Sequence, residues 1–248
     1  MAAKKANRNP VTKRKGLSAN AWTTIAVVVV AVLVIGGVLL FNRKDNPAPP
    51  QGTVAAEILN PPGSNTLTTA SGGAVTVVEF IDYQCPVCEE YYQNVTKSIE
   101  HDYAGKITFV TRNFPLPMHP LAVPAAKAAE AAAMQGKYRE MYDKLYGDYP
   151  TWALAADGKN VSEDTARAQA RFDAYAKELG LDLAKFHADA ASPEVQKRID
   201  QGKADGGKAG VTGTPTIFVN GTKLEPSGNT FAAVAQQLRG QLDKALAQ

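Results

Sequence analysis

The longest hydrophobic run of the chain lies near its amino end. Residues 22–41, from Trp22 to Phe41, are apolar apart from two threonines and contain no charged side chain. Twenty helical residues span about 30 Å, which is the thickness of the hydrocarbon layer of a bilayer. The run also lacks the polar face of a helix that packs on a protein core. The pattern therefore predicts one transmembrane helix over residues 22–41.

The pattern after this run is typical of a folded domain. Residues 42–66 are rich in proline and predict a linker and lead-in to a domain over residues 67–248. β-Branched and aromatic residues make residues 75–83 a buried strand, and a helix is expected over residues 85–103. A second strand is expected over residues 107–112. A strand, a helix and a strand in close succession predict a βαβ unit whose two strands are parallel.

A long helical block follows this unit. Its helices start after serine N-caps or end at glycine, which are signals that favour helix boundaries. The helices expected in the block are, in chain order, residues 121–135, 137–146, 162–179, 181–190 and 193–208, with Ser162 and Ser192 as N-caps of the third and fifth.

Strand character returns near the carboxyl end. Strands over residues 216–219 and 222–224 flank Asn220-Gly221, a pair that strongly favours a hairpin turn. An amphipathic helix over residues 230–247 follows. The order predicts an α/β fold in which the first and last strands form one sheet, with a helical insertion at about residues 117–209 between them.

Charge gives the orientation of the apolar run. Residues 1–21 carry six lysines and arginines, Arg43 and Lys44 follow the run, and residues 1–44 contain no acidic residue. Because positive flanks stay in the cytoplasm, we expect a basic cytoplasmic tail over residues 1–21 and an extracytoplasmic domain held at the cell membrane. A cleaved signal peptide is the alternative. Its apolar core spans only about 7–15 residues and ends in small residues, so we favour an uncleaved anchor.

The rest of the chain is mildly acidic. Of the 27 lysines and arginines, 19 lie after residue 44 together with all 24 acidic residues, so the net charge of +3 reflects the tail. This balance argues against a nucleic-acid-binding domain. The two cysteines exclude a disulfide-rich scaffold and a four-thiolate zinc site. We expect no metal or other cofactor and, without coiled-coil heptads, a monomer.

The two cysteines lie at the junction of the first strand and its helix. Cys85 and Cys88 are separated by Pro86 and Val87. A helix N-terminus favours a thiolate, and proline suits the first helical position. Cys88 lies one turn further on, so the outer sulfur can attack a substrate and the inner one can resolve the mixed disulfide. A structural disulfide would close a very small loop, and a metal site would need more ligands at suitable spacing. We therefore predict redox chemistry.

Three segments of the chain resemble one known family. Residues 80–88 resemble the active-site run of the DsbA-like branch of the thioredoxin superfamily. Residues 113–122, with the Ala-rich helix that follows, resemble the segment that enters the helical insertion of that branch. Residues 213–216 resemble its cis-proline loop, and the likeness extends from about Val75 to the carboxyl end. The resemblance implies a thioredoxin fold with an inserted helical subdomain, here joined to one N-terminal transmembrane helix.

The resemblance also implies roles for individual residues. Pro215 would be cis and face the cysteine pair, and the Thr214 backbone would offer a strand-like edge to a bound peptide, next to Pro86 and Val87. Glu79 would lie beneath the inner cysteine and accept its proton. A partly solvated Glu79 at the end of the sheet is the alternative. If this carboxylate is buried in so apolar a run, its pKa should be raised, which suits proton transfer.

Several other side chains are candidates for a site but fit a structural role better. A lone His119 is expected to cap or pack rather than to catalyse. A set of apolar and aromatic residues could line a substrate groove, although core packing is the more common role of such residues. This set comprises Tyr83, Phe114, Met118, Tyr138, Tyr142 and Tyr146.

The resemblance implies a membrane-tethered thiol–disulfide oxidoreductase that forms disulfide bonds in exported proteins. Electrons from substrate thiols would pass to Cys85 and Cys88, and a membrane partner, quinone-linked by resemblance, would reoxidise the pair. A reductase or isomerase of the same fold is one alternative. A tethered peptide-binding or chaperone module, or a scaffold that only anchors partners, is another, and in these the cysteines would be incidental.

The third residue of the cysteine motif bears on the direction of the reaction. Strongly oxidising relatives carry a histidine where this chain has Val87, whose side chain has no charge or hydrogen-bond donor to stabilise the Cys85 thiolate. We therefore expect an intermediate reduction potential. A Val87→His variant should have a higher potential, by about 30 mV for each tenfold change in the equilibrium constant with glutathione. An unchanged potential would contradict this interpretation.

Overall fold

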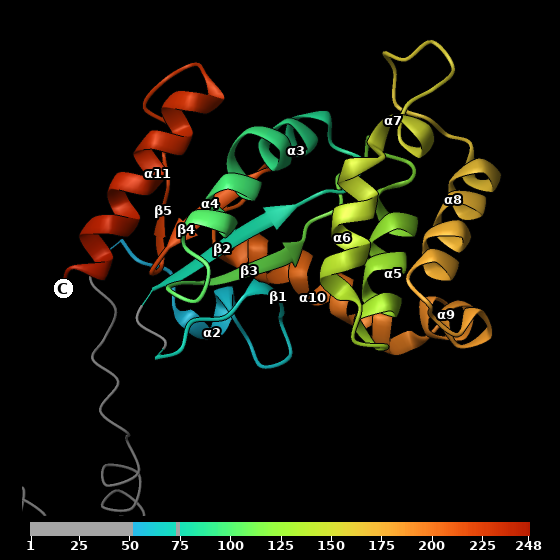
Figure 1. The fold of residues 1–248 in the computed structure, drawn as a ribbon, viewed down its shortest axis with the longest axis horizontal. Helices are drawn as coiled ribbons and strands as arrows, with labels where there is room; N and C mark the ends of the chain where they lie inside the picture. Colours follow the sequence, from blue (N-terminus) through green and yellow to red (C-terminus); the bar gives the residue numbers. More distant parts are fainter. Residues whose placement is uncertain (1–51, 73–74) are drawn as a thin grey trace, which may run out of the picture. The chain divides into compact units, whose positions relative to one another are not determined.

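Strand β2 (Thr76–Ile81) lies in the middle of the sheet, and five of its six residues are buried. The computed structural model describes residues 52–72 and 75–248. Its five-stranded sheet has the order β1-β3-β2-β4-β5 (Figure 1). The other strands are β1 (Asn65–Thr68), β3 (Thr108–Asn113), β4 (Thr216–Val219) and β5 (Thr222–Lys223). The pair β2–β3 is parallel, as the βαβ pattern predicted, and the remaining pairs are antiparallel.

The predicted helices occur in the predicted order, and the structure adds the short helices α2 (Ala56–Leu59) and α7 (Tyr149–Trp152), which the sequence did not predict. In chain order, the helices are α2, α3 (Pro86–Tyr91), the π-helical η1 (Tyr92–Thr96), α4 (Lys97–Asp102), α5 (Ala122–Ala133), α6 (Tyr138–Gly147), α7, α8 (Thr165–Glu178), α9 (Leu183–Ala190), α10 (Pro193–Lys208) and α11 (Phe231–Leu246). Helices α5 to α10 all lie between β3 and β4 in the chain, which confirms the helical insertion and the α/β fold class. Figure 1 shows α5, α6, α8 and α9 together at one end of the sheet.

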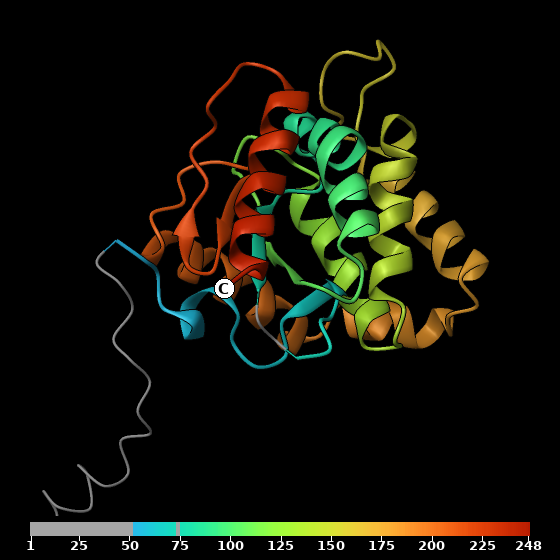
Figure 2. The same ribbon diagram turned by 60° about the vertical axis from the view of Figure 1, so that its left-hand side comes forward.

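The alternation of side chains along β2 divides the core into two layers. Val77 and Ile81 belong to the larger cluster, which includes residues of α3, η1 and α11 and of the insertion. Val78 and Phe80 belong to the smaller cluster on the other face, with Leu59 at the end of α2. Figure 2 shows α11 beside α3 and α4. Residue 79 therefore faces the helix that carries the cysteines.

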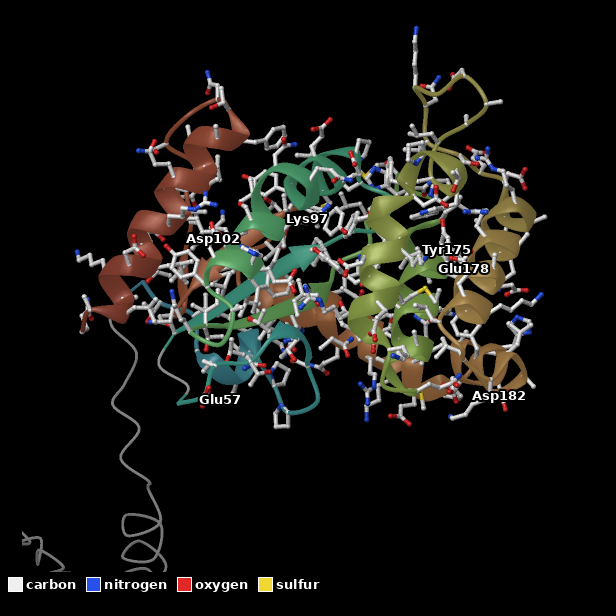
Figure 3. All side chains as sticks on the ribbon, in the orientation of Figure 1. Glu57, Lys97, Asp102, Tyr175, Glu178 and Asp182 are labelled. Atoms are coloured by element: carbon white, nitrogen blue, oxygen red, sulfur yellow. The ribbon has the colours of Figure 1, made fainter. Side chains whose placement is uncertain are left out.

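Polar contacts hold α8 against the rest of the insertion. The Tyr175 hydroxyl of α8 donates a hydrogen bond to the Asp148 carboxylate at 2.7 Å. Glu178, one turn further along α8, forms an ion pair with Lys144 of α6 (Figure 3). The alanines of α5 are buried beneath these helices, and their small side chains allow close helix packing.

The membrane prediction concerns a part of the chain that the structure does not describe. The expected tail over residues 1–21 and the expected transmembrane helix over residues 22–41 both lie outside the described residues. Within residues 52–72 and 75–248, no helix has the length and apolar character needed to cross a bilayer. The anchor therefore stays a prediction from the sequence.

One helix lies within residues 42–66, where the sequence predicted a linker and lead-in, and one strand begins at the end of that range. Helix α2 and strand β1 both depend on distant partners, which sequence patterns do not reveal. Arg112 of β3 donates hydrogen bonds to the carbonyls of Ile58 and Leu59 at the end of α2. The same guanidinium forms a buried ion pair with Asp205 of α10 at 2.8 Å. Strand β1 pairs with the edge of β3.

Two helix predictions need correction. Ser162 is not the N-cap of α8, because that helix begins at Thr165 and the Asp164 side chain accepts the hydrogen bond from the Arg167 backbone N–H. The Ser162 hydroxyl instead accepts from the Asp164 N–H at 3.0 Å. The helix expected over residues 85–103 is continuous but contains the π-helical segment η1. Ser192 caps α10, as predicted.

The hairpin prediction is confirmed. Asn220 and Gly221 have φ values of 46° and 84°, as a two-residue turn between antiparallel strands requires. A side chain at Gly221 would also approach the Val54 carbonyl oxygen. The Val54 N–H donates a hydrogen bond to the Gly221 carbonyl at 2.8 Å. Strand β5 ends at Lys223, one residue before the predicted end.

Close packing of α10 on β3 gives a test of this fold. A Cβ at Gly202 would lie 2.5 Å from the Asn113 carbonyl oxygen, a backbone atom that cannot easily move. A Gly202→Ala variant should therefore lose about 1–3 kcal/mol of unfolding free energy. In the matched control Gly207→Ala, on the same helix, the new Cβ meets nothing within 4 Å, so stability should be unchanged or slightly higher. Urea denaturation of both variants would measure this, and equal stabilities would contradict the packing.

Candidate active site

The two cysteines lie where β2 leads into α3. Cys85 is the N-cap of α3 and Pro86 occupies its first turn, as predicted. Both cysteines are free thiols. Cys85 is 5% exposed and Cys88 is 1% exposed, so the outer sulfur is more buried than the sequence suggested. Pro86 and Val87 are exposed beside it, and 49% of the Val87 surface is accessible.

The pKa values of the two thiols are shifted in opposite directions. A hydrogen bond from Cys88 is the main factor that lowers the pKa of Cys85 to about 6, and backbone N–H groups at Val87 and Cys88 add to it against the effect of burial. These N–H groups belong to the first turn of α3, as expected for a thiolate at a helix start. Burial raises the pKa of Cys88 well above its usual range. At neutral pH the outer sulfur is therefore a thiolate and the inner one a thiol, which suits disulfide exchange.

The loop before β4 lies against the outer cysteine. The Thr214–Pro215 peptide bond is cis, as predicted. The Cys85 sulfur lies 3.5 Å from the Thr214 carbonyl oxygen and, when protonated, donates a hydrogen bond to it. A cavity of about 150 Å³ opens beside this loop and is lined by Pro215, Tyr91 of α3 and Leu224, among others. The structure thus brings the predicted cysteine and proline residues together.

Glu79 of β2 is buried on the side of the sheet that faces the cysteine helix. It is 1% exposed, so the alternative of a partly solvated carboxylate is wrong. The Thr96 hydroxyl of η1 donates a hydrogen bond to Glu79 Oε2 at 3.2 Å. Burial raises the pKa of Glu79 to about 7, against the opposing effect of this hydrogen bond. Glu79 can therefore exchange a proton near neutral pH.

The structure shows no hydrogen bond between Glu79 and the inner cysteine among the described residues. Within residues 52–72 and 75–248, the side-chain hydrogen bond of Glu79 goes to Thr96, not to Cys88. Burial raises the pKa of Tyr91, and the charges of Glu79 and Cys88 add to this effect. Both groups therefore lie within electrostatic reach of the same phenol.

Asp82 was not singled out by the sequence, although it precedes the cysteines closely. Its carboxylate is fully buried and accepts hydrogen bonds from the N–H groups of Gln84 and Leu116, both at 2.8 Å. His119 approaches the same carboxylate, with 2.7 Å between Nδ1 and Oδ2. The Asp82 carbonyl accepts from the Cys85 N–H at 3.1 Å. His119 therefore packs against the active-site loop, as expected, and forms a hydrogen bond with Asp82 there.

Gln84 is the second residue that sequence reasoning missed. It is 0% exposed, and its amide donates to the carbonyls of Ala153 and Ser162 at 3.0 and 2.7 Å. Its side-chain oxygen accepts from the Leu121 N–H at 2.6 Å. The Tyr149 hydroxyl donates to the Gln84 carbonyl at 2.6 Å. The only sign of these roles in the sequence was that Asp82 and Gln84 are polar residues at alternate positions of an otherwise apolar run.

The candidate groove residues mostly form the core. All of Tyr83, Phe114, Tyr138, Tyr142 and Tyr146 are buried in the two hydrophobic clusters. Met118 differs, because 63% of its surface is exposed. Within the part of the chain that the structure describes, no three His, Cys, Asp or Glu side chains are grouped so that they could hold a metal ion.

Comparison with known proteins agrees with this geometry. The thioredoxin family model matches residues 70–238. The crystal structure of a thioredoxin-like oxidoreductase from Silicibacter pomeroyi is 28% identical, with a TM-score of 0.60 over 79% of this chain and 99% of that one. The crystal structure of oxidised BdbD from Bacillus subtilis shares the fold at 19% identity, with a TM-score of 0.61 over 79% of this chain and 97% of that one.

Curated relatives include longer proteins. The Na⁺/H⁺ antiporter NhaA 3 of Salinispora tropica is 37% identical over 150 residues, which are 60% of this chain and 20% of that protein. NhaA 1 of Salinispora arenicola is 36% identical over 162 residues, or 65% of this chain and 22% of that protein. The chain therefore spans about a fifth of the length of these relatives.

The raised pKa of Glu79 predicts a pH dependence of stability. Folding favours the protonated carboxyl, so its contribution is complete below pH 4.5 and is lost as the pH rises through about 7. Relative to Glu79→Gln, the native chain should lose about 3 kcal/mol of unfolding free energy between pH 4 and pH 8. Urea denaturation of the disulfide form would measure this without titration of the thiols. The exposed Glu57→Gln control should follow the native profile, and a parallel profile for Glu79→Gln would contradict the prediction.

Proposed function

The chain belongs to the thioredoxin family, and on that premise we propose that it is a DsbA-like oxidoreductase that forms disulfide bonds in exported proteins. The cysteine pair beside the cis Thr214–Pro215 bond is the observation that carries this proposal. A low pKa at Cys85 and a high one at Cys88 give the two sulfurs the distinct roles that disulfide exchange needs.

The proposed reaction starts from the Cys85–Cys88 disulfide. A substrate thiolate attacks the Cys85 sulfur, a mixed disulfide forms, and the electron pair of the broken bond goes to Cys88. Because the pKa of Cys88 is high, this sulfur takes up a proton, and Glu79 with its pKa of about 7 is the proposed source. A second substrate thiolate then attacks the substrate sulfur of the mixed disulfide. Cys85 leaves as a stable thiolate, so the substrate is oxidised and the cysteine pair has gained two electrons.

The proposed direction, in which substrate thiols are oxidised, rests on the stability of the reduced cysteine pair. Thiolate pKa values are about 7 in thioredoxin and about 3.5 in strongly oxidising DsbA. The pKa of Cys85, about 6, lies between them. A more stable thiolate makes the reduced form more stable and its disulfide a stronger oxidant. This supports a potential between the two extremes, on the oxidising side of thioredoxin.

The exposed residues around Cys85 are the proposed contact surface for a polypeptide substrate. Pro86 and Val87 are exposed, and the Thr214 carbonyl lies next to the sulfur. The cavity beside Pro215 would receive a side chain of the bound peptide. The apolar run over residues 22–41 would tether this domain to the outer face of the membrane, next to a membrane partner that reoxidises the cysteines.

The reduction potential of the full-length chain, purified in detergent and equilibrated with glutathione buffers, tests this function. We expect a value between about −120 and −270 mV, and oxidation of a reduced, unfolded test protein. A Cys85→Ser variant should be inactive, and Cys88→Ser should accumulate a mixed disulfide with the test protein. A potential near −270 mV would overturn the disulfide-forming direction. Absence of a reversible two-electron transition would overturn the enzymatic function itself.

A further inference from the structure

His119 lies in the connection between β3 and α5, and its ring is close to the active-site loop. Its side chain is 10% exposed, and its Nδ1 lies 2.7 Å from the Asp82 carboxylate, which is 0% exposed. The other two partners of this carboxylate are neutral backbone N–H groups, of Gln84 and Leu116. A positive charge stabilises a buried carboxylate further than neutral donors do, and among these partners only the imidazole can provide one.

The same loop connects His119 to the reacting sulfur. Asp82 holds the imidazole through its side chain and the Cys85 N–H through its backbone carbonyl, at 3.1 Å. The position of Cys85 and that of the imidazole are therefore both fixed by Asp82. The side chain of Val87, between the cysteines, offers neither a charge nor a hydrogen-bond donor.

The charges of His119 and Cys85 interact. The hydrogen bond to Asp82 is the main factor that raises the pKa of His119, burial opposes it, and the negative charges of Asp82 and Cys85 add to the increase. Asp82 and Cys85 are thus the charged groups that act on the imidazole. Because a charge interaction is reciprocal, an imidazolium that is stabilised by the Cys85 thiolate must stabilise that thiolate equally.

We propose that His119, oriented by Asp82, is a positioning residue whose positive charge stabilises the Cys85 thiolate and makes the Cys85–Cys88 disulfide a stronger oxidant. The inference rests on the proposed redox function and extends it to a residue outside the cysteine motif. Without the imidazolium, the buried Asp82 carboxylate would be an uncompensated negative charge close to the thiolate. The reduced form would then be less stable.

A His119→Gln variant of the full-length chain tests the proposal through the potential. The glutathione equilibrium should shift up to about tenfold toward a weaker oxidant, equivalent to about 30 mV. The Cys85 thiolate, followed by its ultraviolet absorbance, should form at higher pH. The matched control is His187→Gln, which removes an imidazole bound to Asp173 at 2.8 Å on the helices α8 and α9. This control should leave both readouts at native values, and equal potentials of His119→Gln and the native chain would overturn the proposal.

A second measurement needs no substitution. The pKa of His119, followed by NMR in the native chain, should be higher when the cysteines are reduced than when they form a disulfide, because oxidation removes the thiolate. The same pKa in both states would overturn the proposal even if His119→Gln failed to fold. The titration of Cys85 in the reduced chain needs no redox reaction, so it tests the role of His119 separately from the proposed function. If His119→Gln raises the pKa of Cys85 but the chain has no reversible potential, the stabilisation of the thiolate by His119 stands, while the proposed function and the effect on the disulfide both fail.

Discussion

Asp82 and Gln84 are buried polar side chains beside the cysteines, and burial obliges each to find hydrogen-bond partners. A buried polar group without a partner costs about 1–3 kcal/mol, so these contacts strongly restrict how the chain can pack. Gln84 finds its partners at Leu121, Ala153 and Ser162, which all belong to the insertion. The helical insertion therefore holds the loop that presents Cys85.

This constraint places the chemistry at the boundary between the sheet and the insertion. The Cys88 thiol and, to a smaller extent, the N–H groups in the first turn of α3 donate hydrogen bonds to the Cys85 sulfur, which favours a thiolate there. One turn later, Cys88 lies in the apolar interior, which favours the neutral thiol. The pKa values of two identical side chains are thus shifted in opposite directions, because a short helical segment passes from the rim of the core to its interior.

Much of the fold was predictable because its signals are local. The Asn220-Gly221 turn, the Ser192 cap and the β-branched and aromatic run of β2 each depend on neighbours in the chain, and the structure agrees with all three. Helix α2 and strand β1 were missed because contacts with Arg112 and β3 stabilise them. The Ser162 cap was wrong because the serine side chain serves a local turn and its carbonyl serves Gln84.

The candidate site shows the same division. The sequence by itself determined the dithiol motif, its place at the start of a helix and an acid on the buried strand, since each is encoded within a few neighbouring residues. The position of Pro215 opposite the cysteines was implied only by the family resemblance. Only the tertiary structure decided that Glu79 is buried beside Thr96, that Gln84 is held by the insertion, and that His119 reaches Asp82. These outcomes depend on which distant backbone and side-chain groups meet in the folded chain, because burial and hydrogen-bond partners, not residue type, set the acidity of each group.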